Sequence, residues 1–212
     1  MPDLAVLLSV LDYGAVAVFG ASGALAAARR KHDIITFGFF AAITGVGGGT
    51  LRDLLLGAPV FWVARPTYIV VCLAVATAVW MLGSGKRREL VLNWLDAFGM
   101  AAYSVVGALK ALTLGAPPLT AVILGVMTAT CGGMIRDVLA GEPSVLLRRE
   151  IYITAALSGA AAFTTLALAG LGAWQAGLAG FLVAFVLRGG AILFGWRLPG
   201  YPGGAPDSKS DM

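Results

Sequence analysis

The sequence predicts an all-α membrane protein with seven transmembrane helices, arranged as two inverted three-helix repeats followed by a seventh helix. Three observations lead to this fold class. The chain of 212 residues is 59% hydrophobic and only 12% charged, with a mean hydropathy of +0.89. It contains seven apolar stretches of about the length that crosses a bilayer, roughly 20 residues. Two segments that lie 84 residues apart have closely similar sequences.

Composition also excludes several classes of protein. A soluble domain carries about 25% charged residues, twice the share found here. The net charge of +4 comes from cations at the ends of apolar stretches, which is typical of topology signals and not of a nucleic-acid surface. His32 is the only histidine and no phosphate-binding loop is present, so we expect neither an enzyme nor a metal or cofactor site.

The expected spans cover about 4–27, 34–56, 67–84, 90–113, 119–140, 151–171 and 174–194. They form one transmembrane domain over 1–198, with repeat one at about 4–84 and repeat two at about 90–171. The remaining residues, 199–212, are rich in Pro, Gly and Ser and are expected to be a disordered cytoplasmic tail.

Cations set the expected orientation of the chain. The first, third and fifth connectors hold three, three and two basic residues, whereas the second, fourth and sixth hold only Arg65. Arg188, Arg197 and Lys209 add positive charge near the C-terminus. The positive-inside rule therefore places the N-terminus outside and the C-terminus in the cytoplasm.

The internal repeat is the strongest signal in the chain. Residues 11–69 aligned with residues 95–153 give 19 identities in 59 positions without a gap. Unrelated segments of this composition would give about six, so the sequence indicates a duplication. Because each copy has three spans, the second copy enters the membrane in the opposite sense, as in many transport proteins.

Ionisable residues within spans are candidate functional residues because charge is costly in a membrane interior. Six of them form pairs under the repeat: Asp12 with Asp96, Arg52 with Arg136, and Asp53 with Asp137. We expect Asp12 to face Arg52 and Asp96 to face Arg136, either as structural ion pairs or as part of a transport path. Neighbouring residues on a helix point in different directions, so Arg52 is not expected to neutralise Asp53.

Lys110 has no charged counterpart, because its repeat partner is Ala26. Its side chain either extends to the interface or projects toward Asp53 as a removable plug. The connector at 58–65 is apolar, and we expect Phe61 and Trp62 to dip into lipid from it.

Glycines interrupt the second and fifth spans at matched positions: Gly47, Gly48 and Gly49, then Gly132 and Gly133. Such clusters either break or kink a helix beside a water-filled path, or allow another helix to pack closely. Their repetition in both halves favours the pathway interpretation.

The doubled pattern of a glycine cluster followed by Arg-Asp, within a three-plus-three repeat over residues 5–195, resembles the prokaryotic trimeric intracellular cation (TRIC) channels. That family is also described as a glycine transporter domain family. The resemblance implies a prokaryotic plasma (inner) membrane protein that forms a homotrimer with one pore per subunit. The pore would conduct potassium, with sodium also permeant, between the kinked second and fifth spans.

On this resemblance the glycine clusters form the kinks, and Arg52, Asp53, Arg136 and Asp137 lie beside the pore. Lys110 is the gating candidate, and lipid is a possible further ligand. A secondary transporter of a small zwitterion such as glycine is the alternative function, and a structural membrane protein without flux is a third.

Overall fold

The computed structural model describes residues 2–83, 88–144 and 151–199. Within these residues the protein is helical, with eight helices and no strand. They are α1 (Pro2–Arg29), α2 (Ile34–Leu55), α3 (Phe61–Ala64), α4 (Thr67–Leu82), α5 (Arg88–Thr113), α6 (Pro118–Leu139), α7 (Ile153–Leu168) and α8 (Ala173–Phe194). The expected tail lies outside the described residues except for Pro199.

In the part of the chain that the structure describes, five helices are long and apolar enough to cross a membrane: α1, α2, α5, α6 and α8. The chain is therefore a multi-pass helical membrane protein, as its composition predicts. Helices α4 and α7 are apolar but have only 16 residues each, and both are shorter than the spans expected there. The connector between α2 and α4 contains the additional four-residue helix α3.

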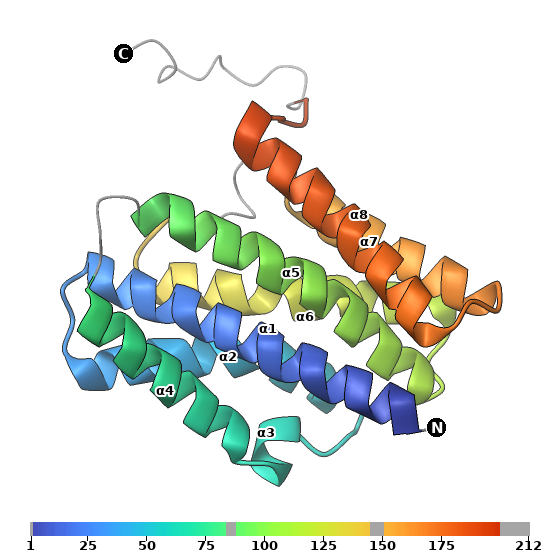
Figure 1. Cartoon of the computed structure of the whole chain (residues 1–212), viewed down its shortest axis with the longest axis horizontal. Helices are drawn as coiled ribbons and strands as arrows, with labels where there is room; N and C mark the ends of the chain where they lie inside the picture. Colours follow the sequence, from blue (N-terminus) through green and yellow to red (C-terminus); the bar gives the residue numbers. More distant parts are fainter. Residues whose placement is uncertain (1, 84–87, 145–150, 200–212) are drawn as a thin grey trace.

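Two groups of helices pack against each other (Figure 1). In the first group α4 lies against α1 and α2, and in the second α7 lies against α5 and α6. Helix α1 contacts α5 and helix α2 contacts α6, so the two groups meet along four long helices. Helix α8 packs outside this centre, against α5 and α7.

Helices α2 and α6 cross at their glycines. A Cβ atom added at Gly48 would collide with the carbonyl oxygen of Thr128, and one added at Gly132 would come within 2.5 Å of the carbonyl oxygen of Thr44. These two contacts are equivalent under the 84-residue offset. The glycines therefore let one backbone rest directly on the other, which is the close-packing alternative.

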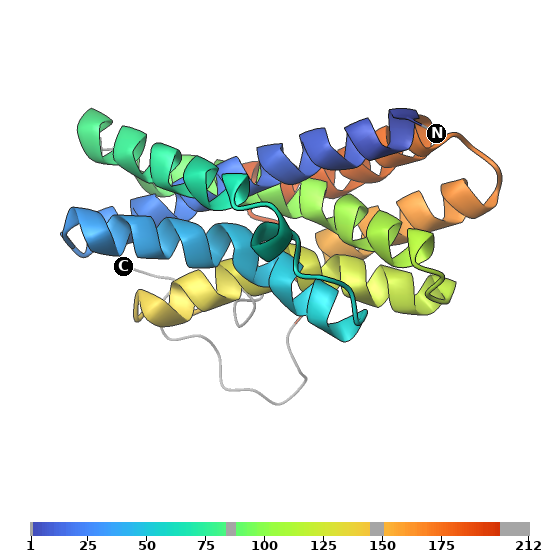
Figure 2. The same cartoon turned by 90° about the horizontal axis from the view of Figure 1, so that it is seen from below.

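Of the break or kink expected at the glycines, the break is absent, because both α2 and α6 run as single helices through their glycines. A bend remains: Figure 2 shows both helices changing direction near the place where they cross. Glycine tolerates this bend, and the close approach of the two backbones explains why larger residues are absent there.

Matched turns end the two crossing helices. Gly57 follows α2 with φ 62°, and Gly141 follows α6 with φ 65°. In both turns the next residue donates its backbone N–H to the carbonyl of the motif aspartate, at 2.9 Å.

At the start of α2, Asp33 Oδ1 accepts a hydrogen bond from the backbone N–H of Thr36 at 2.8 Å. This hydrogen bond lowers the pKa of the Asp33 carboxyl below its ordinary value.

Candidate functional site: two charged clusters

The first charged cluster surrounds Arg136 on α6 and is closed. Arg136 donates from Nη1 to Asp96 Oδ1 at 2.7 Å and to Ser22 Oγ at 3.1 Å. Its Nε and Nη2 donate to Asp137 Oδ1 at 2.9 and 2.8 Å. The side chain of Arg136 is 1% exposed, so these four hydrogen bonds compensate for the loss of water around a buried charge.

The second cluster surrounds Arg52 on α2 and is looser. Arg52 Nε donates to Asp53 Oδ1 at 2.8 Å, but Arg52 Nη1 lies 4.0 Å from Asp12 Oδ1. Within the described residues neither Nη1 nor Nη2 of Arg52 has a hydrogen-bond partner, although the side chain is fully buried. The ring of Phe61 lies 5.7 Å from the guanidinium carbon and supplies a cation–π contact.

The structure brings together both pairs that the sequence matched, Asp12 with Arg52 and Asp96 with Arg136. The expectation that Arg52 would not neutralise Asp53 is wrong, and the same holds for Arg136 and Asp137. The Cα–Cβ directions of adjacent helical residues do diverge, but the long arginine side chain folds back to reach the neighbouring carboxylate.

Lys110 belongs to the Arg52 cluster. Its Nζ lies 2.8 Å from Asp53 Oδ1, and its side chain is 22% exposed. Of the two alternatives, the structure therefore has the side chain of Lys110 directed at Asp53. Asp53 Oδ2 accepts the backbone N–H of Phe61 at 2.9 Å, so both carboxylate oxygens are engaged.

The two clusters consequently differ in the cations beside their carboxylates. The Arg52 cluster has two carboxylates, one guanidinium and one ammonium, which sum to zero. In the Arg136 cluster the guanidinium bonds two carboxylates, and the guanidinium of Arg188 lies close by, 5.0 Å from the centre of the Tyr152 ring. The position equivalent to Lys110 is Ala26, which is buried and carries no charge.

Phe61 is a residue whose place the sequence did not reveal. It was expected in lipid, but it is buried against Gly49, where an added Cβ would come within 2.6 Å of its ring. Gly133 is the equivalent glycine, and an added Cβ there would come within 3.1 Å of Asp96 Oδ1. The last glycine of each motif thus makes room for the cluster beside it.

The sequence also did not reveal the buried contacts of three further polar residues: Ser22, Tyr103 and Arg188. Ser22 lies within an apolar stretch, and nothing in the sequence pairs it with Arg136. Tyr103 donates to the carbonyl of Gly45 at 2.9 Å, and its repeat partner, Phe19, lacks that hydroxyl. Arg188 is only 2% exposed. Its position well inside the apolar stretch 174–194 was an available signal that it is more than a cytoplasmic cation.

A cavity of about 340 Å³ opens beside the Arg52 cluster. We call it the Lys110 cavity. Its lining residues are Ser9, Asp12, Phe61, Ala64, Arg65, Tyr68, Lys110, Thr113 and Leu114. Lys110 lines this space and also holds Asp53, which is fully buried. The ammonium therefore connects a polar cavity to a carboxylate that the cavity does not reach directly.

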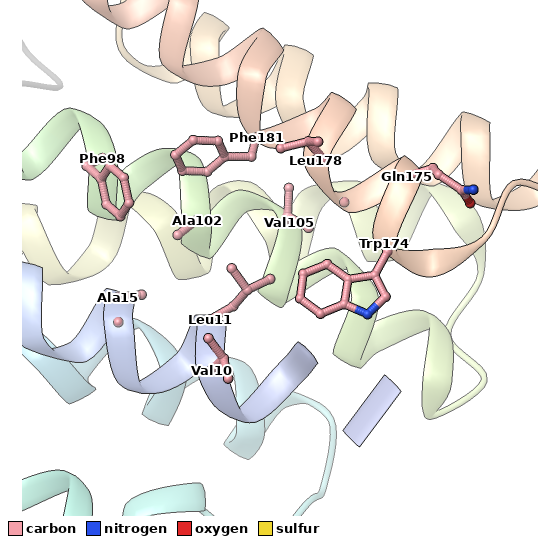
Figure 3. Close-up of a pocket in the computed structure, with 12 residues that line it drawn as sticks. Val10, Leu11, Ala15, Phe98, Ala102, Val105, Trp174, Gln175, Leu178 and Phe181 are labelled. Atoms are coloured by element: carbon pink, nitrogen blue, oxygen red, sulfur yellow. The ribbon is translucent and has the colours of Figure 1, made fainter. Parts of the chain in front are cut away.

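A larger cavity, of about 500 Å³, is unsuited to ions (Figure 3). It lies between α1, α5 and α8 and is lined by apolar side chains apart from Gln175, which the close-up shows at one end. An ion in this space would lose its hydration without gaining polar ligands. The charged clusters are therefore the better candidate for a site that handles ions.

Comparison with known proteins shows the family to which the chain belongs. A family model described as "Glycine transporter" matches two stretches of the chain, residues 9–84 and 93–169. A solved structure of the TRIC trimeric intracellular cation channel orthologue from Rhodobacter sphaeroides is 47% identical, with a TM-score of 0.87 over 89% of this chain and 98% of that one. The chain is a member of the TRIC channel family, which is also described as the glycine transporter family.

Curated bacterial members of this family are membrane proteins. The UPF0126 membrane protein of Vibrio cholerae is 39% identical over 91% of this chain and 82% of its own length. The UPF0126 inner membrane protein YadS of Escherichia coli is 39% identical over 89% of this chain and 93% of its own. A further TRIC cation channel structure is 28% identical, with a TM-score of 0.80.

Proposed function

We propose that this protein is a monovalent cation channel, selective mainly for potassium, that works as a homotrimer with one pore in each subunit. The observation that carries the proposal is the Lys110–Asp53 ion pair between the Lys110 cavity and a fully buried carboxylate. A tethered ammonium at this position occupies a place that a permeant cation can take, since both carry one positive charge.

The proposed path follows α2 and α6. Along this path Asp53 and Asp137 attract cations. Each of these aspartates also forms an ion pair with the arginine that precedes it in the sequence, which compensates part of the negative charge. The Arg52 cluster, which has two carboxylates, one guanidinium and one ammonium, gains a formal charge of −1 when Lys110 moves away, and this charge then attracts cations. Lys110 is thus the proposed gate.

The proposed topology has seven spans in two inverted repeats, with the N-terminus outside and the C-terminus in the cytoplasm. Two separate matches to one family model, and the matched ion pairs and glycine contacts, support the repeat. A helix of 16 residues is about 24 Å long, less than the roughly 30 Å hydrocarbon core. Spanning by α4 and α7 therefore involves a hydrophobic mismatch, which local thinning of the bilayer can accommodate.

The descriptions of related proteins favour a cation over other substrates. The Rhodobacter sphaeroides relative is described as a trimeric cation channel, and that description, together with the charged clusters, also supports a function that is not enzymatic. A secondary transporter of a small zwitterion such as glycine is the second candidate. The observation in its favour is that each cluster offers both a guanidinium and carboxylates, which can bind a carboxylate and an ammonium.

Potassium flux through liposomes that contain purified protein tests the channel and its gate. Lys110→Met removes the ammonium and should raise the potassium flux severalfold, because the place of the ammonium beside Asp53 Oδ1 is then open to the permeant ion. Lys110→Arg is the matched control, because it keeps the positive charge and should keep the flux near that of the wild type. Equal flux in all three proteins would refute gating by Lys110. Slow glycine uptake that saturates, without single-channel events, would favour the transporter.

A further inference from the structure

A second polar cavity lies where the C-terminal end of α8 meets α5. Its volume is about 150 Å³, and it shares no residue with the two charged clusters. The described residues that line it are Asn93, Arg188, Ala191, Ile192, Gly195, Trp196 and Arg197. These include two guanidinium groups and one amide, and no carboxylate. A cavity of this composition is suited to an anion.

Arg188 gives the cavity a buried positive wall. It is 2% exposed, and its guanidinium carbon lies 5.0 Å from the centre of the Tyr152 ring. The aromatic ring holds the planar guanidinium by a cation–π contact, which fixes its orientation. An ionised residue held this deeply in a membrane protein is costly, and such residues are commonly functional.

The turn after α8 brings the second arginine to the cavity. Gly195 adopts a left-handed conformation, with φ 66° and ψ 31°, and donates its backbone N–H to the carbonyl of Ala191 at 3.0 Å. The chain then reverses, so that Trp196 covers Gly190, where an added Cβ would collide with the indole. Arg197 follows directly and lines the same cavity as Arg188.

Exposed aromatic rings beside this cavity favour a position at the level of the lipid headgroups. Phe194 and Trp196 are 71% and 42% exposed, and their rings stack with centroids 5.7 Å apart. Aromatic side chains that lie at the end of a membrane-spanning helix are typical of the interface between hydrocarbon and water. A phospholipid in the adjacent leaflet can therefore reach the cavity with its phosphate.

We propose that this cavity binds the phosphate of an anionic phospholipid. Guanidinium groups bind phosphate oxygens through paired hydrogen bonds, and the amide of Asn93 can add another. The last carbonyls of α8 carry about half a negative charge and oppose binding, but the two arginines outweigh them. Basic pockets between helices on the cytoplasmic side of a membrane recognise anionic headgroups in this way. The inference does not depend on ion conduction.

Native mass spectrometry of the full chain in detergent tests this site, with phosphatidylglycerol and phosphatidylcholine as the probes. We expect phosphatidylglycerol to bind more tightly than phosphatidylcholine, and Arg197→Gln to weaken its binding about tenfold, as expected for one lost charged hydrogen bond. Arg188→Lys keeps the buried charge but loses paired hydrogen bonding, and should weaken binding as well. Arg30→Gln is the control, since it removes an exposed cation that pairs with Glu142 at 3.2 Å, away from the cavity.

Two results would overturn the proposal. One is equal affinity for the two lipids, and the other is the same loss of phosphatidylglycerol binding in Arg197→Gln and Arg30→Gln. Inorganic phosphate, added at increasing concentration, distinguishes a lipid from a soluble anion. If phosphate alone stabilises the protein against heat as much as phosphatidylglycerol does, and Arg197→Gln abolishes both effects, the ligand is a free phosphate and the lipid assignment is wrong.

Discussion

Neutralising the two matched aspartates should have unequal effects on stability, although the repeat makes them equivalent. Asp96 accepts a hydrogen bond from Arg136 at 2.7 Å, whereas Asp12 lies 4.0 Å from Arg52 and makes no hydrogen bond with it. We expect Asp96→Asn to destabilise the protein more than Asp12→Asn does.

The distances give the size of the difference. With an effective dielectric constant of about 20, two unit charges attract by about 6 kcal/mol at 2.7 Å and about 4 kcal/mol at 4.0 Å. Each variant recovers some free energy because a neutral side chain is cheaper to bury, and this gain is similar at the two buried sites. The free energy of unfolding should therefore fall by about 2 kcal/mol more for Asp96→Asn.

Thermal unfolding in detergent, followed by tryptophan fluorescence, measures this difference. For a chain of this size, 2 kcal/mol corresponds to a Tm difference of about 4–8 °C. A double-mutant cycle with Arg136→Gln then isolates the Asp96–Arg136 interaction from other effects of the substitution. Equal Tm values for the two single variants, or a lower Tm for Asp12→Asn, would refute the reasoning from hydrogen-bond geometry.

Three further predictions concern packing, a helix end and a buried hydroxyl. Gly132→Ala should abolish stable folding or lower the Tm strongly, because the added methyl group meets a backbone carbonyl. Gly47→Ala should be tolerated, because the neighbour of its methyl group is the flexible end of an isoleucine side chain. Similar Tm values for the two variants would contradict the close-packing account. The lowered pKa of Asp33 stabilises the fold above about pH 3.8, its unfolded value, and this contribution is lost as the pH falls through the lower folded pKa. A Tm titration should therefore show Asp33→Ala below the wild type at neutral pH and closer to it at acid pH, and a gap that does not narrow would count against the helix cap. Tyr103→Phe should reduce the free energy of unfolding by about 1 kcal/mol in chemical denaturation, since it removes one buried hydrogen bond to Gly45, and an unchanged value would show that this hydrogen bond makes no net contribution.

Part of the candidate site could be predicted from the sequence. The repeat matched Asp12 with Asp96 and Arg52 with Arg136. Because charge is costly in a membrane interior, each arginine was expected to have a carboxylate partner. The distances between the partners could not be predicted, because they depend on how α1 packs on α2 and how α5 packs on α6. That packing gives Arg136 four hydrogen bonds and leaves Arg52 with one to a carboxylate.

The glycine clusters show where local reasoning fails. Propensity predicts that consecutive glycines weaken a helix, and this favoured a break or a kink in the backbone. In the folded protein α2 and α6 remain continuous because each supports the other, with Gly48 on Thr128 and Gly132 on Thr44. Tertiary contact therefore outweighs propensity at this crossing.

The sequence by itself determined that the chain lies in a membrane, that it is helical and that it contains a duplicated segment, because these follow from hydropathy and from pairwise identity along the chain. Only the tertiary structure decided that Lys110 binds Asp53, that Phe61 is buried beside Arg52 and that Arg188 lines a cavity with Arg197. These contacts join residues far apart in sequence or depend on side-chain direction. Their existence is set by the angle and distance between packed helices, and composition and periodicity do not encode these quantities.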